Sequence, residues 1–301
     1  MHRVGRKTWG DIAIDAVIYL SLIFLVVVTL YPFLNTLAVS FNDAMDSSRG
    51  GITLWPRKFT LYNYQTLLTR SQIYHATLVS AARTILSTVL GTFCTAMAAY
   101  IISRREFVFR RLVSFIYVLT MYIDGGLVPT YFLMRSLGLV NSFWVYVVPG
   151  LVSAFNLIVI RTYIAGLSDS YVESARIDGA GEFTIFLRII LPLCKPVLAT
   201  IALFIAVDNW NAWFDTFLYN SANARLSTLQ YELMKVLQSA NTMSGSLLQA
   251  LSRAAAGTTN TVTPRAIRAT MTIIVSVPIV AVYPFLQRYF VHGLTLGGIK
   301  E

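Results

Sequence analysis

Six segments of this chain are each long and apolar enough to cross a lipid bilayer, and this pattern constrains the fold more than any other feature. A spanning helix needs about 20 mostly apolar residues. Only 13% of the residues are charged, compared with about 25% in a soluble domain. We therefore expect an all-α integral membrane protein in which residues 1–301 form a single transmembrane domain. The predicted spans cover residues 14–38, 76–102, 112–134, 143–165, 194–218 and 270–290.

Lysine and arginine are concentrated in short segments that we assign to one side of the membrane. Short cytoplasmic loops carry an excess of these residues, which predicts a multi-pass protein with both termini in the cytoplasm. The net charge of +10 then reflects topology, and we expect no nucleic-acid partner. Thirteen of the 24 basic residues lie on this side: Arg3, Arg6, Lys7, Arg104, Arg105, Arg110, Arg111, Arg161, Arg176, Arg188, Lys195, Arg288 and Lys300.

Two long loops are predicted on the opposite, outer side, over residues 39–75 and 219–266. In the second loop, leucine and valine recur at helical spacing, which predicts short amphipathic helices. The tract AAAGTTNTVTP (254–264) contains four threonines with single Gly, Asn and Pro residues and is typical of a linker or turn. The residues at helical spacing are Leu229, Leu233, Val236, Leu237, Leu247, Leu248 and Leu251.

Residues 168–187 form a charged, glycine-containing patch between the fourth and fifth spans. A helix start is expected at Leu167-Ser168-Asp169, and Gly179-Ala180-Gly181 interrupts the helix. Phe183, Phe186 and Leu187 then resume an apolar face. The pattern predicts two short helices on the membrane surface, joined by an elbow of small residues. A loop that merely connects two spans is the alternative.

The spacing within this patch resembles the hallmark of permease subunits of bacterial ABC importers, the EAA motif. That motif is Glu-Ala-Ala, three residues, Gly, nine residues, Ile, one residue and Leu-Pro. The chain departs from it at Ser174, where alanine is usual, and serine is also small. The positions that match are Glu173, Ala175, Gly179, Ile189, Leu191 and Pro192.

The resemblance extends over nearly the whole chain and narrows to the maltose-transporter type of carbohydrate-uptake permease. Within that type the chain resembles the LplC/YtcP-like polysaccharide and oligosaccharide subgroup. The segments that carry this likeness are NYQTLL (63–68), GGLVPTYFLMRSLGLVNSFW (125–144), SAFNLIVIRTYI (153–164), KPVLATIALFIAVDNWNAWFD (195–215) and YPFLQRYFVHGLTLGGIKE (283–301).

The resemblance implies a type I ABC importer permease fold in the bacterial inner membrane, with a cytoplasmic coupling helix that docks on an ATP-binding subunit. The implied partners are a second homologous permease forming a heterodimer, two ATP-binding subunits, an extracellular or periplasmic solute-binding protein, an oligosaccharide and membrane lipid. Acidic, uronic polysaccharide fragments are a possible substrate class. The implied ATPase-docking residues are Glu173, Ser174, Ala175, Asp178, Gly179 and Ala180.

No motif in the chain predicts catalysis. The nearest approach to a P-loop, Gly293 to Gly298, is followed by Ile299 where the motif has lysine. The histidines His2, His75 and His292 show no metal-ligand spacing. We expect no cofactor or metal in this chain, and ATP and Mg bound by the partner subunits.

Polar residues inside the spans are candidates for the substrate pathway. Amides hydrogen-bond sugar hydroxyls and indole rings stack on sugar faces. Two further interpretations stay open for the fifth span, namely tryptophans at the outer membrane interface and helix packing. Asp124, near the outer end of the third span, is a similar candidate, and a loop position beside Gly125-Gly126 fits it equally. Arg83 and Arg135, near outer span ends, could bind an acidic sugar, and anchoring at the membrane interface fits them as well. The candidates are Asn156, Asp208, Asn209, Asn211, Trp213 and Asp215.

Two other functions remain as alternatives to an ABC importer permease. An ion-coupled secondary sugar transporter would place acids deep in its spans, whereas Asp208 and Asp215 lie toward the outer half of the fifth span. A non-transporting membrane sensor of a loaded binding protein would not need a coupling segment. Glu173→Lys separates these hypotheses, since only the ABC importer depends on this residue.

Overall fold

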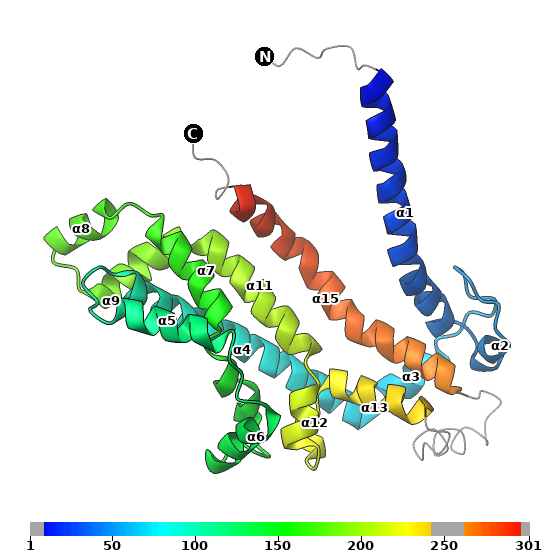
Figure 1. Ribbon diagram of the computed structural model, residues 1–301. Coiled ribbons are helices and arrows are strands. Elements are labelled where there is room, and N and C mark those ends of the chain that lie inside the picture. The colour runs from blue at the N-terminus through cyan, green and yellow to red at the C-terminus, as the bar shows by residue number, and fades with distance from the viewer. Residues whose placement is uncertain (1–8, 242–261, 296–301) are drawn as a thin grey trace. The chain divides into compact units, whose positions relative to one another are not determined.

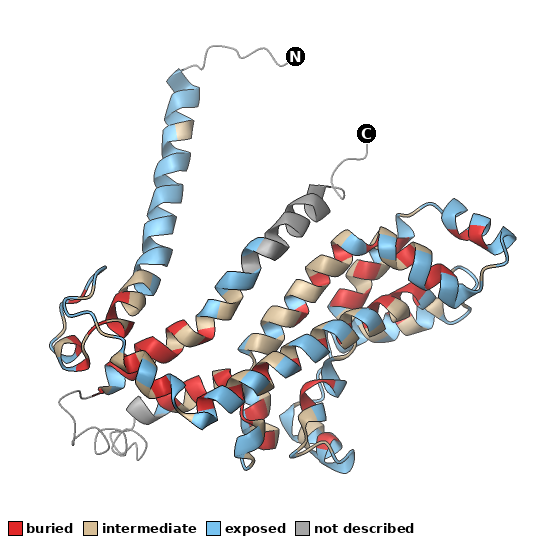
Figure 2. Ribbon diagram, turned by 180° about the vertical axis from the view of Figure 1, so that it is seen from behind, coloured by how far each residue is buried: buried red, intermediate tan, exposed pale blue. Residues whose placement is uncertain are grey.

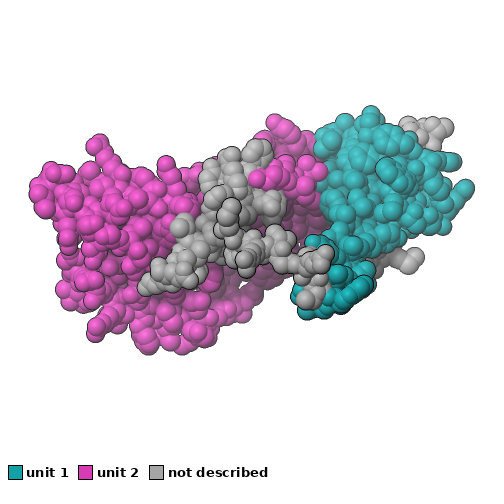
Figure 3. All heavy atoms as spheres, turned by 90° about the horizontal axis from the view of Figure 1, so that it is seen from above, with its two compact units in different colours: residues 1–69, 236–274 teal, residues 70–235, 275–301 magenta. Residues whose placement is uncertain are grey.

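The computed structural model describes residues 9–241 and 262–295, and these ranges form helices and connecting turns without a β-strand (Figure 1). A single antiparallel bridge joins Asn42 and Phe59. The prediction of an all-α protein is confirmed. The chain divides into two compact units, one of residues 1–69 and 236–274 and the other of residues 70–235 and 275–301 (Figure 3).

The first unit contains a long, exposed apolar helix. Its elements are α1 (Trp9–Ser40), α2 (Ala44–Ser48), α3 (Tyr62–Leu68), the end of α13 (Leu229–Asn241) and the start of α15 (Pro264–Thr295). Most of α1 is exposed, and its large apolar side chains remain exposed as far as Phe33 (Figure 2). A helix that is apolar all round requires lipid or another protein around it.

The segment after α1, predicted as an outer loop, is held in place by side-chain amides. The Asn63 side chain is buried and donates to the carbonyl oxygens of Ser40 (3.1 Å) and Asn42 (2.9 Å). Arg57 pairs with Asp46 at 3.0 Å. The hydrogen bond from Asn42 lowers the pKa of the Asp46 carboxyl, and Arg57 acts in the same direction. Buried polar groups need such partners, so this connection has a defined conformation.

The second unit is built around three helices, α4 (Ser71–Ser103), α7 (Ala154–Ala165) and α11 (Lys195–Asn211), which pack side by side. Small residues of α4 such as Ala96 and Ala99 meet Ile160 and Ile201 in the core. Small residues let helices approach closely in a membrane. The remaining elements are α5 (Arg110–Thr120), α6 (Leu127–Ser136), η1 (Phe143–Tyr146), η2 (Val148–Gly150), α8 (Ser170–Ile177), α9 (Glu182–Ile185), the π-helical turn η3 (Phe186–Ile190), α10 (Leu191–Leu193), α12 (Phe214–Asn220) and η4 (Ala224–Leu226).

Three of the described helices are long and apolar enough to cross a membrane, and the number rises to five if two bent pairs each count as one span. The predicted spans 14–38, 76–102 and 270–290 lie within α1, α4 and α15. The predicted span 143–165 corresponds to a pair bent by 44°.

The predicted third span, 112–134, differs more from the structure, because it comprises α5 and α6 with a turn between them. Gly126 has a φ of +82°, and its amide donates to the Asp124 carboxylate at 3.1 Å. Such an Asx turn competes with a continuous helix.

The second predicted outer loop, 219–266, contains α13, which carries Leu229, Leu233 and Val236. The predicted apolar positions Leu247, Leu248 and Leu251, and most of the predicted linker 254–264, lie outside the described residues.

Candidate functional site: a coupling elbow and a polar hollow

The predicted surface patch forms two short helices with a sharp turn between them, which we call the coupling elbow (residues 168–187). The α8 helix ends at Ile177, and the amides of Gly179 and Ala180 donate to the carbonyls of Arg176 (3.0 Å) and Ala175 (2.9 Å). This is the Schellman arrangement, which places a glycine in the left-handed region. Gly179 has a φ of +78°, so the glycine of the motif ends α8 and redirects the chain into α9.

The residues of the elbow divide into a buried and an exposed set. Val172 and Ala175 are buried and belong to the core of the second unit, and Ala180 packs against it. Glu173, Ser174, Asp178 and Gly179 are exposed. Of the predicted docking residues, these four are therefore accessible to a partner, whereas Ala175 seats α8 on the bundle.

An ion-pair network ties the elbow to the end of α4. The Tyr100 hydroxyl donates to Glu182 at 2.6 Å, and Arg176 contacts Glu182 at 2.7 Å and Glu106 at 2.6 Å. The Tyr100 hydrogen bond, followed by Arg176, lowers the pKa of Glu182. Arg176 likewise lowers the pKa of Glu106, and the two carboxylates raise the pKa of the guanidinium. All three groups therefore stay charged at neutral pH.

At the other end of the second unit, where α6 and α12 lie (Figure 1), polar and apolar side chains together surround a hollow of about 280 Å³, most of whose accessible lining is apolar. We call it the polar hollow, after the charged and amide groups at its wall. It brings together residues from α4, α6, η1, η2, α11 and α12. Hydroxyl, amide and carboxylate groups lie among apolar and aromatic side chains there, a combination typical of small-molecule sites. Its lining residues are Arg83, Thr130, Met134, Val145, Tyr146, Pro149, Gly150, Asp208, Asn209, Ala212, Asp215 and Tyr219.

Arg83 organises this hollow from within α4. The residue is 2% exposed and forms an ion pair with Asp215 through both terminal nitrogens. One of these nitrogens also donates to the Ala212 carbonyl at 3.2 Å, and the guanidinium lies 4.6 Å from the Tyr146 ring centre. A buried charge requires such compensation. Sequence reasoning left Arg83 as one of several span-end residues, although an arginine within an apolar span is itself a functional signal.

The structure places some of the predicted pathway residues at the polar hollow and others elsewhere. Asp208, Asn209 and Asp215 line the polar hollow. Asn211, Trp213 and Asn156 do not, and Trp213 instead packs against Phe214 and Phe217. Trp210 donates to the Val275 carbonyl at 3.0 Å, which favours the helix-packing interpretation for that tryptophan. Tyr146 and Tyr219 were not predicted.

Comparison with known proteins identifies a family over most of the chain. Residues 87–296 match the family described as binding-protein-dependent transport system inner membrane component. In Bacillus subtilis (strain 168), the polygalacturonan/rhamnogalacturonan transport system permease protein YtcP is 32% identical, over 95% of this chain and 98% of its own length. Protein LplC of the same organism is 34% identical, over 91% and 90%.

Solved structures give the same fold. A chain from the crystal structure of a bacterial ABC transporter involved in the import of the acidic polysaccharide alginate superposes with a TM-score of 0.84 and 25% identity, over 95% of this chain and 100% of that one. A chain from the alginate transporter in complex with an alginate pentasaccharide-bound periplasmic protein has a TM-score of 0.57 at 17% identity and supports the fold alone. With its type I ABC importer permease fold, the chain belongs to the family of binding-protein-dependent transport system inner membrane components.

Proposed function

We propose that this chain is a permease subunit that imports oligosaccharides across a bacterial inner membrane, with both termini in the cytoplasm, and that separate subunits bind ATP and Mg and hydrolyse the ATP. The observation that carries this proposal is the coupling elbow, where Glu173, Ser174 and Asp178 are exposed on a helix seated by Val172 and Ala175. The exposed Glu173 and Asp178 carboxylates can pair with basic groups on a partner, and a helix seated on the bundle can transmit the partner's motion to the second unit.

The assembly that we propose contains a second, homologous permease, two ATP-binding subunits and a solute-binding protein. Membership of a binding-protein-dependent family supports the last of these. The exposed apolar surface of α1 provides contact area for lipid or for the second permease. The binding protein would deliver its sugar to the outer segments 39–75 and 219–266.

We place the sugar pathway at the polar hollow. Asp208 and Asn209 would accept and donate hydrogen bonds to sugar hydroxyls. Tyr146 is buried beneath the Arg83 guanidinium and Tyr219 stacks on Tyr131, so these two rings shape the wall of the hollow. The relatives named above concern polygalacturonan, rhamnogalacturonan and alginate, which makes uronic oligosaccharides the first class to test. Because Arg83 is already paired with Asp215, we expect hydroxyl recognition to dominate in this subunit.

In the proposed cycle, ATP binding draws the two coupling elbows together. The helices that pack on each elbow, α4 and α11, then tilt, and the pathway changes from inward-facing to outward-facing. The bent connection between Glu182–Leu193 and Lys195–Asn211, at 83°, joins the elbow directly to α11. Hydrolysis by the partner subunits resets the cycle.

Glu173→Lys tests this proposal, because it reverses the charge on the exposed face of α8. We expect loss of both ATPase co-purification and ATP-dependent uptake. Asp11→Lys is the control, since it makes the same charge change at an exposed residue in the first turn of α1, outside the coupling elbow. Unchanged uptake in Glu173→Lys, combined with collapse of uptake when the ion gradient is dissipated, would favour an ion-coupled transporter.

A further inference from the structure

A second hollow, of about 590 Å³, lies at the end of the second unit that carries α8 (Figure 1). We call it the arginine hollow. Its walls come from the end of α4, the turn before α5, the start of α5, the end of α7 and α8. The charged residues that line it are Arg104, Arg105, Arg110, Arg111, Arg161 and Arg176, with Glu106, Asp169 and Glu173.

The charges of the arginine hollow are unbalanced. Six arginines face three carboxylates, so the hollow carries a formal excess of three positive charges. Arg176 is paired with Glu106 and Glu182, and Arg105 lies 3.5 Å from Asp169. The other lining arginines, Arg104, Arg110, Arg111 and Arg161, have no ion-pair partner within the described ranges 9–241 and 262–295. Gathering like charges costs free energy that a bound anion would offset.

The position of two of these arginines on α5 adds to the attraction for an anion. Arg110 and Arg111 are the first two residues of this 11-residue helix, whose first turn contains no acid. The amino end of a helix carries a partial positive charge, so basic side chains are unfavourable there and an anion is favourable.

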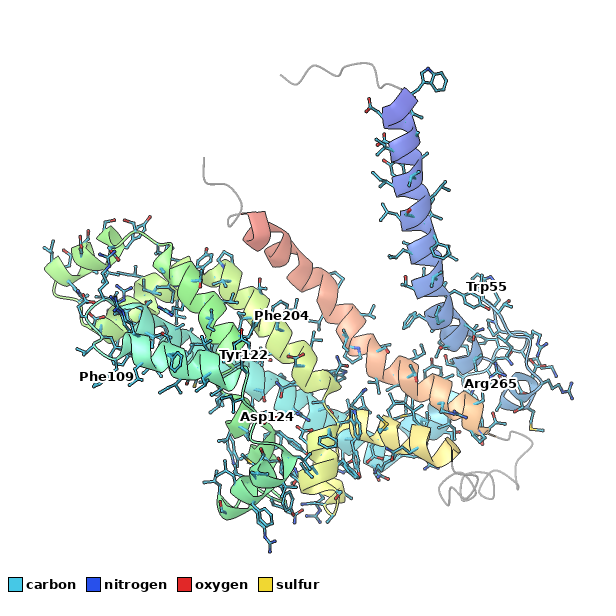
Figure 4. The ribbon with its side chains drawn as sticks, in the orientation of Figure 1. Trp55, Phe109, Tyr122, Asp124, Phe204 and Arg265 are labelled. Carbon is cyan, nitrogen blue, oxygen red and sulfur yellow. The ribbon has the colours of Figure 1, made fainter. Side chains whose placement is uncertain are left out.

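An exposed apolar strip borders the same arginines. Val108 is 86% exposed, Phe109 60%, Leu112 55% and Phe115 63%. Phe109 lies at the start of α5 (Figure 4). Free phosphate would use only the guanidinium groups and would leave these side chains in water. A phospholipid would use both surfaces, with its phosphate on the arginines and its acyl chains on the apolar strip.

We propose that the arginine hollow binds the headgroup of an anionic phospholipid from the adjacent leaflet. Basic pockets between membrane helices are suited to such headgroups. The site goes beyond the proposed import function, because it requires only that this end of the protein lies at a membrane surface. Since Glu173 lines the same hollow, a bound lipid also lies beside the proposed ATPase-docking face.

The test measures how much lipid the full-length chain retains. The chain is purified through a tag, together with any subunits that remain bound to it. Nanodiscs of phosphatidylcholine mixed with phosphatidylglycerol, or of phosphatidylcholine alone, provide the lipid, and native mass spectrometry counts the adducts. Wild type should retain phosphatidylglycerol preferentially. Arg110→Gln/Arg111→Gln should bind it roughly thirtyfold more weakly, since each basic residue near an anionic surface contributes about 1 kcal/mol.

Two control variants make the test specific. Arg188→Gln removes an exposed arginine that does not line the hollow and should retain wild-type binding. Arg110→Lys/Arg111→Lys keeps both charges and should retain most of the binding. Equal retention in the wild type and the glutamine double variant overturns the proposal.

A measurement on the unchanged protein covers the case in which the variants fail to fold. Phenylglyoxal modification of Arg110 and Arg111 should be slower in discs that contain phosphatidylglycerol than in phosphatidylcholine discs. Millimolar inorganic phosphate should not displace the lipid or give the same protection. Protection by phosphate alone, or only when an ATP-binding subunit is attached, assigns the hollow to another occupant and overturns the lipid site.

Discussion

Arg83 and Asp215 lie 132 positions apart in sequence, yet they share one ion pair at the edge of the polar hollow. The Arg83 side chain is 3% exposed and that of Asp215 is 25% exposed. Losing one partner of a buried pair leaves an uncompensated charge, whereas replacing both with apolar residues is often neutral.

Asp215→Asn should therefore destabilise the protein by about 3–5 kcal/mol. Thermal unfolding in detergent, followed by size-exclusion fluorescence, measures the loss. The double variant Arg83→Met/Asp215→Leu should recover most of the stability while losing polar character in the hollow. Asp208→Asn is the control, because Asp208 lines the same hollow and forms no ion pair within the described residues. Equal destabilisation in both single variants would contradict the role of the pair.

The acids of the coupling elbow predict a pH dependence. Glu182 has a pKa below the ordinary value of 4.5, first because Tyr100 donates to it and then because of Arg176. A lowered carboxyl pKa stabilises the fold fully above the unfolded-state value, and this contribution is lost as the pH falls through the folded-state pKa. Hydrogen exchange in residues 170–185, corrected for intrinsic rates, should be constant from about pH 7 to about pH 5 and increase below 4.5.

The variant Glu182→Gln provides the control for this titration. It removes the charge that Arg176 pairs with, so its exchange should already be raised at neutral pH and should respond less to acid. An increase of exchange in the wild type between about pH 7 and about pH 5 would point to a different titrating group.

The residue scale also shows where sequence reasoning reaches its limit. Asp208, Asn209 and Asp215 were predicted from polarity within an apolar span, and all three line the hollow. Arg83 was visible as an isolated charge, but its partner was not, because no local pattern links α4 to α12. Tyr146 and Tyr219 carried no signal, since aromatic residues are common throughout membrane spans.

At the scale of elements, the sequence predicted the two helices and the turn of the coupling elbow, but it did not predict the break in the fifth span. Gly179-Ala180-Gly181 is a local break, and the structure ends α8 there. The predicted span 194–218 is interrupted after Asn211, and α12 begins at Phe214. Ala212 and Trp213 carry no strong break signal. The Ala212 carbonyl, near the end of α11, accepts a hydrogen bond from Arg83, a long-range contact that local propensity does not register.

Gly179→Ala tests the turn of the coupling elbow. A Cβ at Gly179 would meet nothing within 4 Å, so the cost comes from its φ of +78° alone. We expect about 1 kcal/mol of local destabilisation, seen as faster hydrogen exchange in α8 and weaker ATPase association. Gly181→Ala is the matched control, with equally open space and no positive φ. A similar effect of both substitutions would show that the left-handed conformation of Gly179 is not the cause of the destabilisation.

At the scale of the whole molecule, composition predicted a helical membrane protein and the EAA-like spacing predicted the family, and both are confirmed by the match over residues 87–296. Hydropathy alone did not show that two of the predicted spans consist of shorter helices. Residues 112–134 are interrupted by the turn before Gly126, and residues 143–165 by the break between Gly150 and Ala154. Membrane proteins tolerate such breaks when neighbouring groups satisfy the backbone. The hydropathy of a segment therefore predicts that lipid surrounds it, but it does not predict whether the helix runs through the segment without a break.

The most direct test of the proposed function is sugar-stimulated ATP hydrolysis in liposomes that contain this chain, a second permease, ATP-binding subunits and a binding protein. Neutral and uronic oligosaccharides are compared, with the Glu173→Lys chain in parallel. We predict stimulation by one class of oligosaccharide in the wild type and none in the variant. A folded chain that recruits no ATP-binding subunit, with every partner present, would contradict the assignment of residues 168–187 as the coupling segment.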